Sequence, residues 1–317
     1  MRYVSTRGIR PATAGFEQVV LEGLARDGGL FVPEAWPQLD PQLWADWQAV
    51  PPSYEDVAVE VMGAFVGDMD RATLRSLVRE GLDSFPHEVV PLVDIGEGVH
   101  LLELFHGPTL AFKDLALQFL GPLFDHFMDQ RGGRATILGA TSGDTGSAAI
   151  HGCRGRSSLD IFITHPLGRT SEVQRRQMTT VLDANVHNIA IEGSFDDCQA
   201  IVKTLFGDAG FREKAGLAAV NSINWARIMA QVVYYFVAGL RVGTPLAFAV
   251  PTGNFGDVFA GYVASKMGLP ITQLIVATNE NDILARFLET GTYQIEGVRP
   301  TLSPSIDIQV SSNFERL

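Results

Sequence analysis

The stretch Ala135-Thr-Ile-Leu-Gly-Ala-Thr-Ser-Gly-Asp-Thr-Gly146 decides the fold, because an apolar run passes directly into a glycine-rich turn. The run is typical of a buried strand, and the residues from about Ser147 onward are typical of a helix. The same alternation continues along the chain, with strand-like runs that each precede a helical stretch: Ala135–Ala140, Leu159–Thr164, Val186–Ile191, Leu217–Val220, Leu246–Val250 and Gln273–Ala277. This rhythm predicts an α/β fold with open, mostly parallel sheets flanked by helices.

Residues 1–95 carry a different pattern, in which amphipathic helical segments alternate with proline-rich connections. Helical spacing of apolar residues predicts helices at Gly15–Ala25, 54–66 and 70–80. In the first of these, the predicted apolar side comprises Phe16, Val19, Val20 and Leu24. This part contains no candidate catalytic group, and we expect it to form a helical arm or cap.

The composition excludes several classes of protein. Of the 317 residues, 46% are hydrophobic and 19% charged, which is enough apolar material for a large core, and the net charge of −12 argues against nonspecific nucleic-acid binding. We expect no membrane helix and no signal peptide, because no apolar run is long enough and the first residues lack an apolar core. The two cysteines, Cys153 and Cys198, predict a reducing, cytoplasmic location. No metal site is predicted, because His151 and Cys153 lack partners at ligand spacing.

Lys113 is the first candidate functional residue. It follows a Gly107-Pro108 turn at the start of an apolar helix, and it is one of only four lysines in the chain. Its apolar neighbours, Phe112 among them, favour partial desolvation, which makes an amine a better nucleophile and suits it to a Schiff base. The alternative is a structural lysine that pairs with the adjacent Asp114.

Two glycine-rich turns follow predicted strands and precede predicted helices. The first is Gly139–Gly146, in which Thr141, Ser142 and Thr145 add hydroxyl groups to the helix start. It matches neither a P-loop nor a nucleophile elbow, and a tight turn capped by Ser142 or Asp144 is the alternative.

The second turn is Pro251-Thr-Gly-Asn-Phe-Gly-Asp257. Gly253 and Gly256 bracket two residues whose amide groups can converge on a phosphate at a helix start. The turn lacks the glycine pattern of a dinucleotide site, and its length suits a monophosphate, although a plain strand-to-helix turn stays open as the alternative. A lysine together with two turns that can each bind an anion fits pyridoxal phosphate and an amino-acid carboxylate.

Four segments of the chain resemble the signature segments of the threonine synthase family: His106–Asp114, Ala140–Gly146, Asn221-Ser-Ile-Asn-Trp-Ala-Arg227 and Gly253-Asn-Phe-Gly-Asp257. Tyr3–Gly8, Asp27–Pro33 and Leu302–Asp307 are similar as well, so the resemblance runs along the whole chain. It implies a fold type II pyridoxal-phosphate enzyme. It also implies a division into an arm at 1–95, a large cofactor domain from 96–132 and 215–317, and a smaller domain at 133–214.

The resemblance implies that the enzyme converts O-phospho-L-homoserine and water to L-threonine and phosphate, as a lyase in threonine biosynthesis. Lys113 would form the Schiff base with pyridoxal 5'-phosphate and move protons. The cofactor phosphate would be bound by Gly253, Asn254, Phe255, Gly256 and Asp257. The substrate would lie against Thr141, Ser142, Gly143, Asp144 and Thr145, with Asn224, Arg227, Arg169 and His106 as candidates for its phosphate, although a structural role is equally open for these last four.

The sequence leaves several alternatives open. One is another lyase or dehydratase of the same fold acting on a hydroxy amino acid, and another is a module that keeps the cofactor without catalysis. In the family the chain continues past the position of Ser311–Leu317, so we expect either a fragment that is weak or inactive or a natural shortened relative. The portion beyond would complete the cofactor domain and place a hydroxyl at the pyridine nitrogen. The oligomeric state stays open, with a homodimer among the alternatives.

Overall fold

The structure, a computed structural model, describes residues 1–8, 13–86 and 88–317, which divide into two compact units. The first unit comprises Met1–Phe16, Leu24–Met69 and Arg227–Leu317, and the second comprises Glu17–Gly23 and Asp70–Ala226. Residues 96–132 therefore fall in the same unit as residues 133–214. The predicted division into an arm and two domains stays a prediction.

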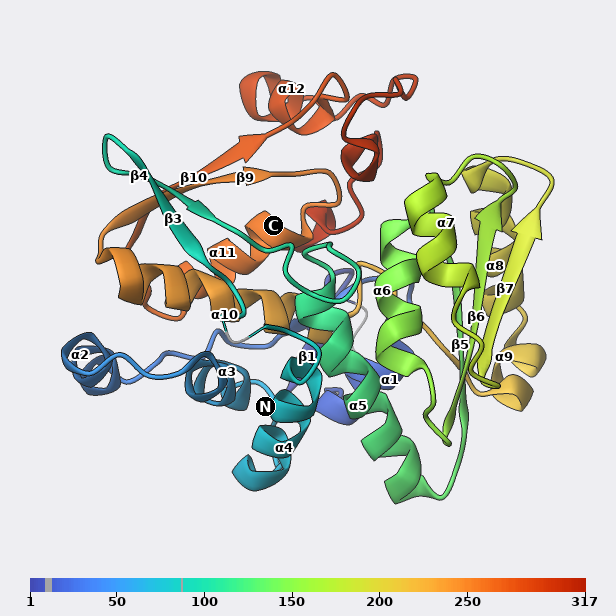
Figure 1. Ribbon diagram of the computed structural model, residues 1–317, viewed down its shortest axis with the longest axis horizontal. Helices are drawn as coiled ribbons and strands as arrows, with labels where there is room; N and C mark the ends of the chain where they lie inside the picture. Colours follow the sequence, from blue (N-terminus) through green and yellow to red (C-terminus); the bar gives the residue numbers. More distant parts are fainter. Residues whose placement is uncertain (9–12, 87) are drawn as a thin grey trace. The chain divides into compact units, whose positions relative to one another are not determined.

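A four-stranded parallel sheet forms the centre of the second unit, with the strand order β7-β6-β5-β8. Helices α6 and α7 lie on one face of this sheet and α8 and α9 on the other (Figure 1). The elements of this unit are α4 (Arg71–Leu82), β3 (Leu92–Gly96), β4 (Val99–Leu102), α5 (Asp114–Arg131), β5 (Ala135–Ala140), α6 (Asp144–Cys153), β6 (Leu159–Pro166), α7 (Glu172–Thr179), β7 (Val186–Ile191), α8 (Phe195–Gly207), α9 (Ala209–Ala215) and β8 (Leu217–Ala218). The alternation of strands and helices predicted from the sequence is confirmed.

Helices α5 and α6 cross at a pair of glycines. A Cβ atom at Gly121 would overlap the carbonyl oxygen of Gly152, and one at Gly152 would overlap the carbonyl oxygen of Leu117. Only residues without a side chain allow two helix backbones to approach so closely. The contact ties the helix that begins after Lys113 to the helix that begins at Asp144.

The first unit contains a parallel strand pair, β9 (Leu246–Pro251) and β10 (Ile271–Ala277), and an antiparallel pair, β1 (Tyr3–Ser5) and β2 (Phe31–Pro33). Its helices are α2 (Pro41–Ala49), α3 (Tyr54–Gly63), α11 (Gly256–Lys266) and α12 (Ile283–Thr290), with short 3₁₀ turns η1 (Pro304–Ile306) and η2 (Phe314–Arg316). Two helices span the division between the units, α1 (Phe16–Glu22) and α10 (Trp225–Val242). Tyr234 and Tyr235 of α10 are both buried, and both donate a hydrogen bond to Asp257 of α11.

Three details of the predicted elements are wrong. The first helix ends at Glu22, and Leu24 is exposed, because Gly23 adopts a positive φ of 67° that stops the helix. The helix after the first glycine turn begins at Asp144, three residues before the predicted Ser147. The amino-terminal part also contains the strands β1 and β2 in addition to helices. The residues that pair in these strands lie 26 or more positions apart, so a local pattern does not reveal them.

No helix in the described part of the chain, residues 1–8, 13–86 and 88–317, has the length and apolar character needed to cross a membrane.

Candidate active site

The loop before Lys113 is organised by the buried carboxylate of Asp114. One carboxylate oxygen accepts the backbone N–H of Thr109 at 2.8 Å, and the other accepts its hydroxyl at 2.8 Å and the amide of Gln118 at 3.2 Å. Burial raises the pKa of the Asp114 carboxyl, and the hydrogen bonds from Thr109 oppose that rise. Gly107 must be a glycine, because a Cβ there would collide with the Asp114 side chain.

Lys113 pairs with Asp144, not with its sequence neighbour. Its Nζ lies 2.5 Å from Oδ2 of Asp144, and the two side chains are only 8% and 12% exposed. The alternative of a lysine paired with Asp114 is wrong for this structure, because adjacent residues at a helix start point in different directions. The expected apolar surroundings are present, since Nζ also lies 4.5 Å from the ring centre of Phe112. The structure therefore holds one buried amine against one carboxylate.

The first glycine turn uses its own side chains to satisfy its backbone amides. The hydroxyl oxygen of Thr141 accepts the N–H groups of Gly143 and Gly146 at 3.0 and 2.8 Å, and Asp144 accepts that of Thr145 at 2.7 Å. The proposed capping by Ser142 or Asp144 is wrong, because the residue that precedes the helix is Gly143, with a φ of 150°, and it makes no side-chain cap. Several of the amides expected to attract an anion are thus already hydrogen-bonded within the turn.

The second glycine turn is arranged in the opposite way, because its carbonyl groups are the ones engaged. The hydroxyl of Ser311 donates to the Gly253 carbonyl at 2.7 Å, and the backbone and side chain of Asn313 donate to the Asn254 carbonyl at 3.0 and 3.1 Å. In a trans peptide the N–H points away from the C=O of the same unit. The N–H groups of Asn254 and Phe255 therefore point away from residues 311–313, at the start of α11.

A network of hydrogen bonds holds residues 301–313 against this turn. Asp307 accepts hydrogen bonds from the side chains of Asn279 at 2.7 Å and Asn281 at 3.1 Å and from the hydroxyl of Thr301 at 2.6 Å. Asn281 also exchanges hydrogen bonds with the backbone of Arg299, at 2.8 Å in each direction. These bonds fix the loop that follows α12, so that residues 306–308 pack against Gly253.

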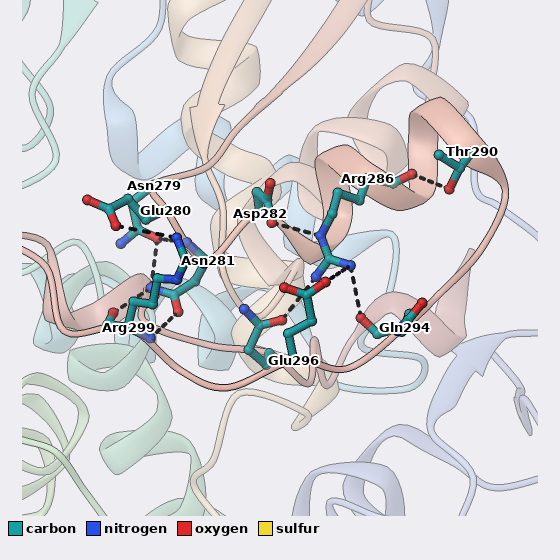
Figure 2. Close-up of polar contacts among 10 residues, drawn as sticks. Asn279, Glu280, Asn281, Asp282, Arg286, Thr290, Gln294, Glu296 and Arg299 are labelled. Atoms are coloured by element: carbon teal, nitrogen blue, oxygen red, sulfur yellow. Dashed lines mark hydrogen bonds and ion pairs between the residues drawn. The ribbon is translucent and has the colours of Figure 1, made fainter.

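Figure 2 shows the same loop held at a second point by Arg286 of α12, which lies between Asp282 and Glu296 at 2.8 and 3.1 Å. Its guanidinium also donates to the carbonyl of Gln294 at 3.2 Å. We did not predict the part played by residues 301–313 from the sequence. The run of small polar residues Ser311-Ser-Asn313 was the available signal.

Asp257 and Asn224, two of the remaining predicted site residues, have hydrogen-bond partners inside the protein. Asp257 accepts from Tyr234 and Tyr235 at 2.5 and 3.0 Å, and burial, together with this carboxylate, raises the pKa of both tyrosines. Asn224 directly precedes α10, and its amide donates to the carbonyls of Val20 and Ala219. These contacts give both residues a structural role, and ligand binding by them stays a prediction.

The other candidates for the substrate phosphate differ in exposure. Arg227 is buried in α10, where its carbonyl accepts a hydrogen bond from Gln231, and Arg169 is exposed after β6. His106 is half-buried and lies 2.7 Å from Glu103. Of the substrate-side residues, Ser142 is exposed and Thr141 is buried. Their contacts with a ligand stay predictions.

Two family profiles match the chain. "Threonine synthase N terminus" matches residues 2–82, and "Pyridoxal-phosphate dependent enzyme" matches residues 90–316. The threonine synthase of Pseudomonas aeruginosa is 58% identical over 100% of this chain and 68% of the relative, and that of Saccharomyces cerevisiae is 48% identical over 99% and 65%. The chain therefore spans about two thirds of the length of these relatives.

A solved structure agrees with the sequence comparisons. The crystal structure of pyridoxal-phosphate-bound threonine synthase from Brucella melitensis superposes with a TM-score of 0.94 at 53% identity, and covers 100% of this chain and 68% of that one. The fold predicted from the sequence, with parallel sheets flanked by helices, is thereby confirmed.

Proposed function

Because the chain belongs to the threonine synthase family of pyridoxal-phosphate-dependent enzymes, we propose that it converts O-phospho-L-homoserine and water to L-threonine and phosphate. The cofactor is pyridoxal 5'-phosphate, which supplies an electron sink for carbanion chemistry when bound. The single observation that carries the assignment is the buried amine of Lys113 at the start of α5.

The residues present fit this cofactor. Lys113 offers a shielded primary amine, which is the group that an aldehyde requires. The turn Gly253–Gly256 offers amides that point to one side of a helix start, and such amides bind a phosphate dianion. A side chain at Gly253 would meet the backbone of Ile306 at 3.0 Å, so only glycine leaves this turn undistorted. We assign the aldehyde end to Lys113 and the phosphate end to Gly253, Asn254, Phe255 and Gly256.

The substrate side is assigned to the first glycine turn. The buried Thr141 hydroxyl holds the amides of Gly143 and Gly146 in place, which leaves Ser142 exposed beside them. A turn fixed in this way keeps its shape without a ligand, and a preorganised turn orients a substrate at lower entropic cost. Arg227 supplies a cation suited to an anionic substrate.

The test compares the wild type with Lys113→Ala after addition of pyridoxal phosphate. We expect the wild type to develop a visible absorbance band that survives dialysis and, after borohydride reduction, a mass increase on the peptide containing Lys113. Lys113→Ala should lose both signals, and phosphate release from O-phosphohomoserine should fall at least about 10³-fold, since the acid and base group is removed. Lys203→Ala, which changes a lysine of α8, is the matched control.

Three outcomes would contradict the proposal. Covalent attachment that persists in Lys113→Ala would place the cofactor on another lysine. Release of pyruvate or 2-oxobutyrate from serine or threonine, without threonine formation from O-phosphohomoserine, would show the lyase or dehydratase alternative instead. Cofactor attachment with no product from any of these amino acids would show a non-catalytic module.

We also propose a cytoplasmic location, which the two free and buried cysteines support. Fractionation of cells that produce the protein tests it, and recovery outside the cytoplasm would contradict it. The homodimer stays a prediction that sedimentation equilibrium can test.

A further inference from the structure

Lys113 and Asp144 form a buried ion pair at the starts of two helices that pack together. Nζ of Lys113 is in hydrogen-bond contact with Oδ2 of Asp144 at 2.5 Å, and both side chains are almost entirely shielded from solvent. The other carboxylate oxygen of Asp144 accepts the N–H of Thr145 in the first turn of α6. Both that hydrogen bond and the helix dipole favour the anionic carboxylate at this position.

The helices that carry the two groups hold them at this separation. Lys113 directly precedes α5, Asp144 begins α6, and these helices are in backbone contact at Gly121 and Gly152. Asp114 fixes the loop on the other side of the lysine through Thr109. The packing of α5 against α6 therefore brings the Lys113 amine and the Asp144 carboxylate together.

We propose that Asp144 is the proton-transfer partner of Lys113 when the lysine captures the cofactor aldehyde. This inference rests on the proposed function, and it assigns Asp144 a task different from the substrate contact predicted from the sequence. In an ion pair with Asp144 the nitrogen of Lys113 is an ammonium group. An ammonium group has no lone pair, so it cannot attack an aldehyde until the proton has moved.

The proton balance of the capture is complete with these two residues and the aldehyde. Asp144 takes one proton from the ammonium group of Lys113, and the freed lone pair forms a bond to the aldehyde carbon. A second proton moves from the nitrogen to the former carbonyl oxygen, which becomes a hydroxyl group. Asp144 then returns its proton to this hydroxyl, which leaves as water as the C=N bond forms. The sum is an ammonium and an aldehyde giving a protonated C=N group and water.

The proposal predicts opposite effects of Asp144→Asn on two rates. Without the carboxylate, a buried ammonium group is uncompensated, so the neutral amine is favoured. Cyanate, a small reagent that modifies neutral amines, should therefore modify Lys113 at least about fivefold faster in the cofactor-free variant. Attachment of pyridoxal phosphate should nevertheless slow at least about tenfold, because the group that returns the proton is missing.

The experiment measures both rates at all four lysines, 113, 203, 214 and 266, by peptide mass spectrometry, with borohydride to trap the attached cofactor. The other three lysines are internal standards. Asp160→Asn is the matched control, because it makes the same chemical change at a carboxylate that is 29% exposed and paired with Arg134. Acetate or formate added to Asp144→Ala should restore part of the attachment rate.

A loosened structure would accelerate both reactions, so the opposite signs separate proton transfer from a structural role. Equal or faster cofactor attachment in Asp144→Asn would overturn the inference, and so would an unchanged cyanate rate at Lys113. If the wild type itself fails to attach pyridoxal phosphate at Lys113, the proposed function fails and this inference fails with it.

Discussion

The two glycine-rich turns look alike in sequence. They differ in whether their backbone N–H groups or their backbone C=O groups are hydrogen-bonded to nearby side chains. In the turn after β5, the Thr141 hydroxyl and the Asp144 carboxylate bind backbone amides. In the turn after β9, Ser311 and Asn313 bind backbone carbonyls, so the amides point the other way. Glycine spacing predicts a tight turn, and the neighbouring side chains decide whether that turn suits an anion.

The two turns also differ in where their supports lie along the chain. Thr141 is within five residues of the amides that it binds, whereas Ser311 and Asn313 are 58 and 59 residues from the carbonyls that they bind. A local support forms with the turn itself. A distant one depends on the network of Asn279, Asn281 and Asp307 that places residues 301–313. The following substitutions test this difference.

Thr141→Val should have the largest effect on stability. Valine keeps the shape of threonine but leaves two buried amide donors without an acceptor, which costs about 2–6 kcal/mol of unfolding free energy at roughly 1–3 kcal/mol each. Urea denaturation measures the loss, with Thr136→Val on the preceding strand β5 as the control, since no hydrogen bond of the Thr136 hydroxyl is found in the described part of the chain. A loss no greater than that of the control would show that the Thr141 hydroxyl does not support the turn.

Asn313→Ala should be less destabilising but should weaken cofactor binding. The change removes one donor to the Asn254 carbonyl and the acceptor for Arg316, at a cost of about 1–3 kcal/mol. Freed from that support, the turn can rotate its amides, and we expect the dissociation constant of pyridoxal phosphate to rise about tenfold in an absorbance titration. An unchanged dissociation constant would mean that the side chain of Asn313 is not needed to orient the turn.

Gly253→Ala should cost about 1 kcal/mol, because the new Cβ would meet Ile306 and Ile308 at 3.0 and 3.1 Å and force a small shift. Gly133→Ala is the matched control, since a Cβ there meets no atom within 4 Å. Urea denaturation should separate the two variants. Equal stability would show that residues 306–308 can shift away from the new Cβ at little cost, and the turn would then be less rigid than its contacts indicate.

Glu315→Gln should have the smallest effect. Glu315 follows Asn313 and binds Arg7 and Thr6, and the hydrogen bond from Arg7 lowers the pKa of its carboxyl below the usual 4.5. A lowered pKa stabilises the folded state above pH 4.5, and this contribution disappears as the pH falls through the lowered value. We expect Tm to fall by about 1–2 °C at pH 7 and low salt. The difference should vanish in acid and in high salt, and a difference that persisted in both would contradict this ion pair as its cause.

The sequence predicted what depends on local pattern. The strands β5 and β7 begin and end at the predicted residues, because each is a short apolar run bounded by glycine or polar residues. The position of Lys113 at a helix start was also predicted, because the Gly107-Pro108 turn and the apolar run after it are both local. Turn residues and apolar spacing carry this information within about ten positions.

Contacts between distant residues were not predictable in this way. Asp114 is adjacent to Lys113 in sequence, yet Asp144, thirty-one positions from the lysine, is the residue that pairs with it. The hydrogen bonds from residues 311–313 to Gly253 and Asn254 depend on the network of Asn279, Asn281, Thr301 and Asp307, which no spacing rule describes. Hydrogen bonds between segments far apart in sequence are set by packing, and periodicity contains no information about it.

The glycine crossing of α5 and α6 has a consequence for how the amine and carboxylate respond to thermal motion. With no side chain between the backbones at Gly121 and Gly152, the two helices have little room to slide or tilt independently. The two helices therefore move together near this contact. Warming or ligand exchange can displace Lys113 and Asp144 together, while the distance between Nζ and the carboxylate, across which a proton would move, stays nearly constant.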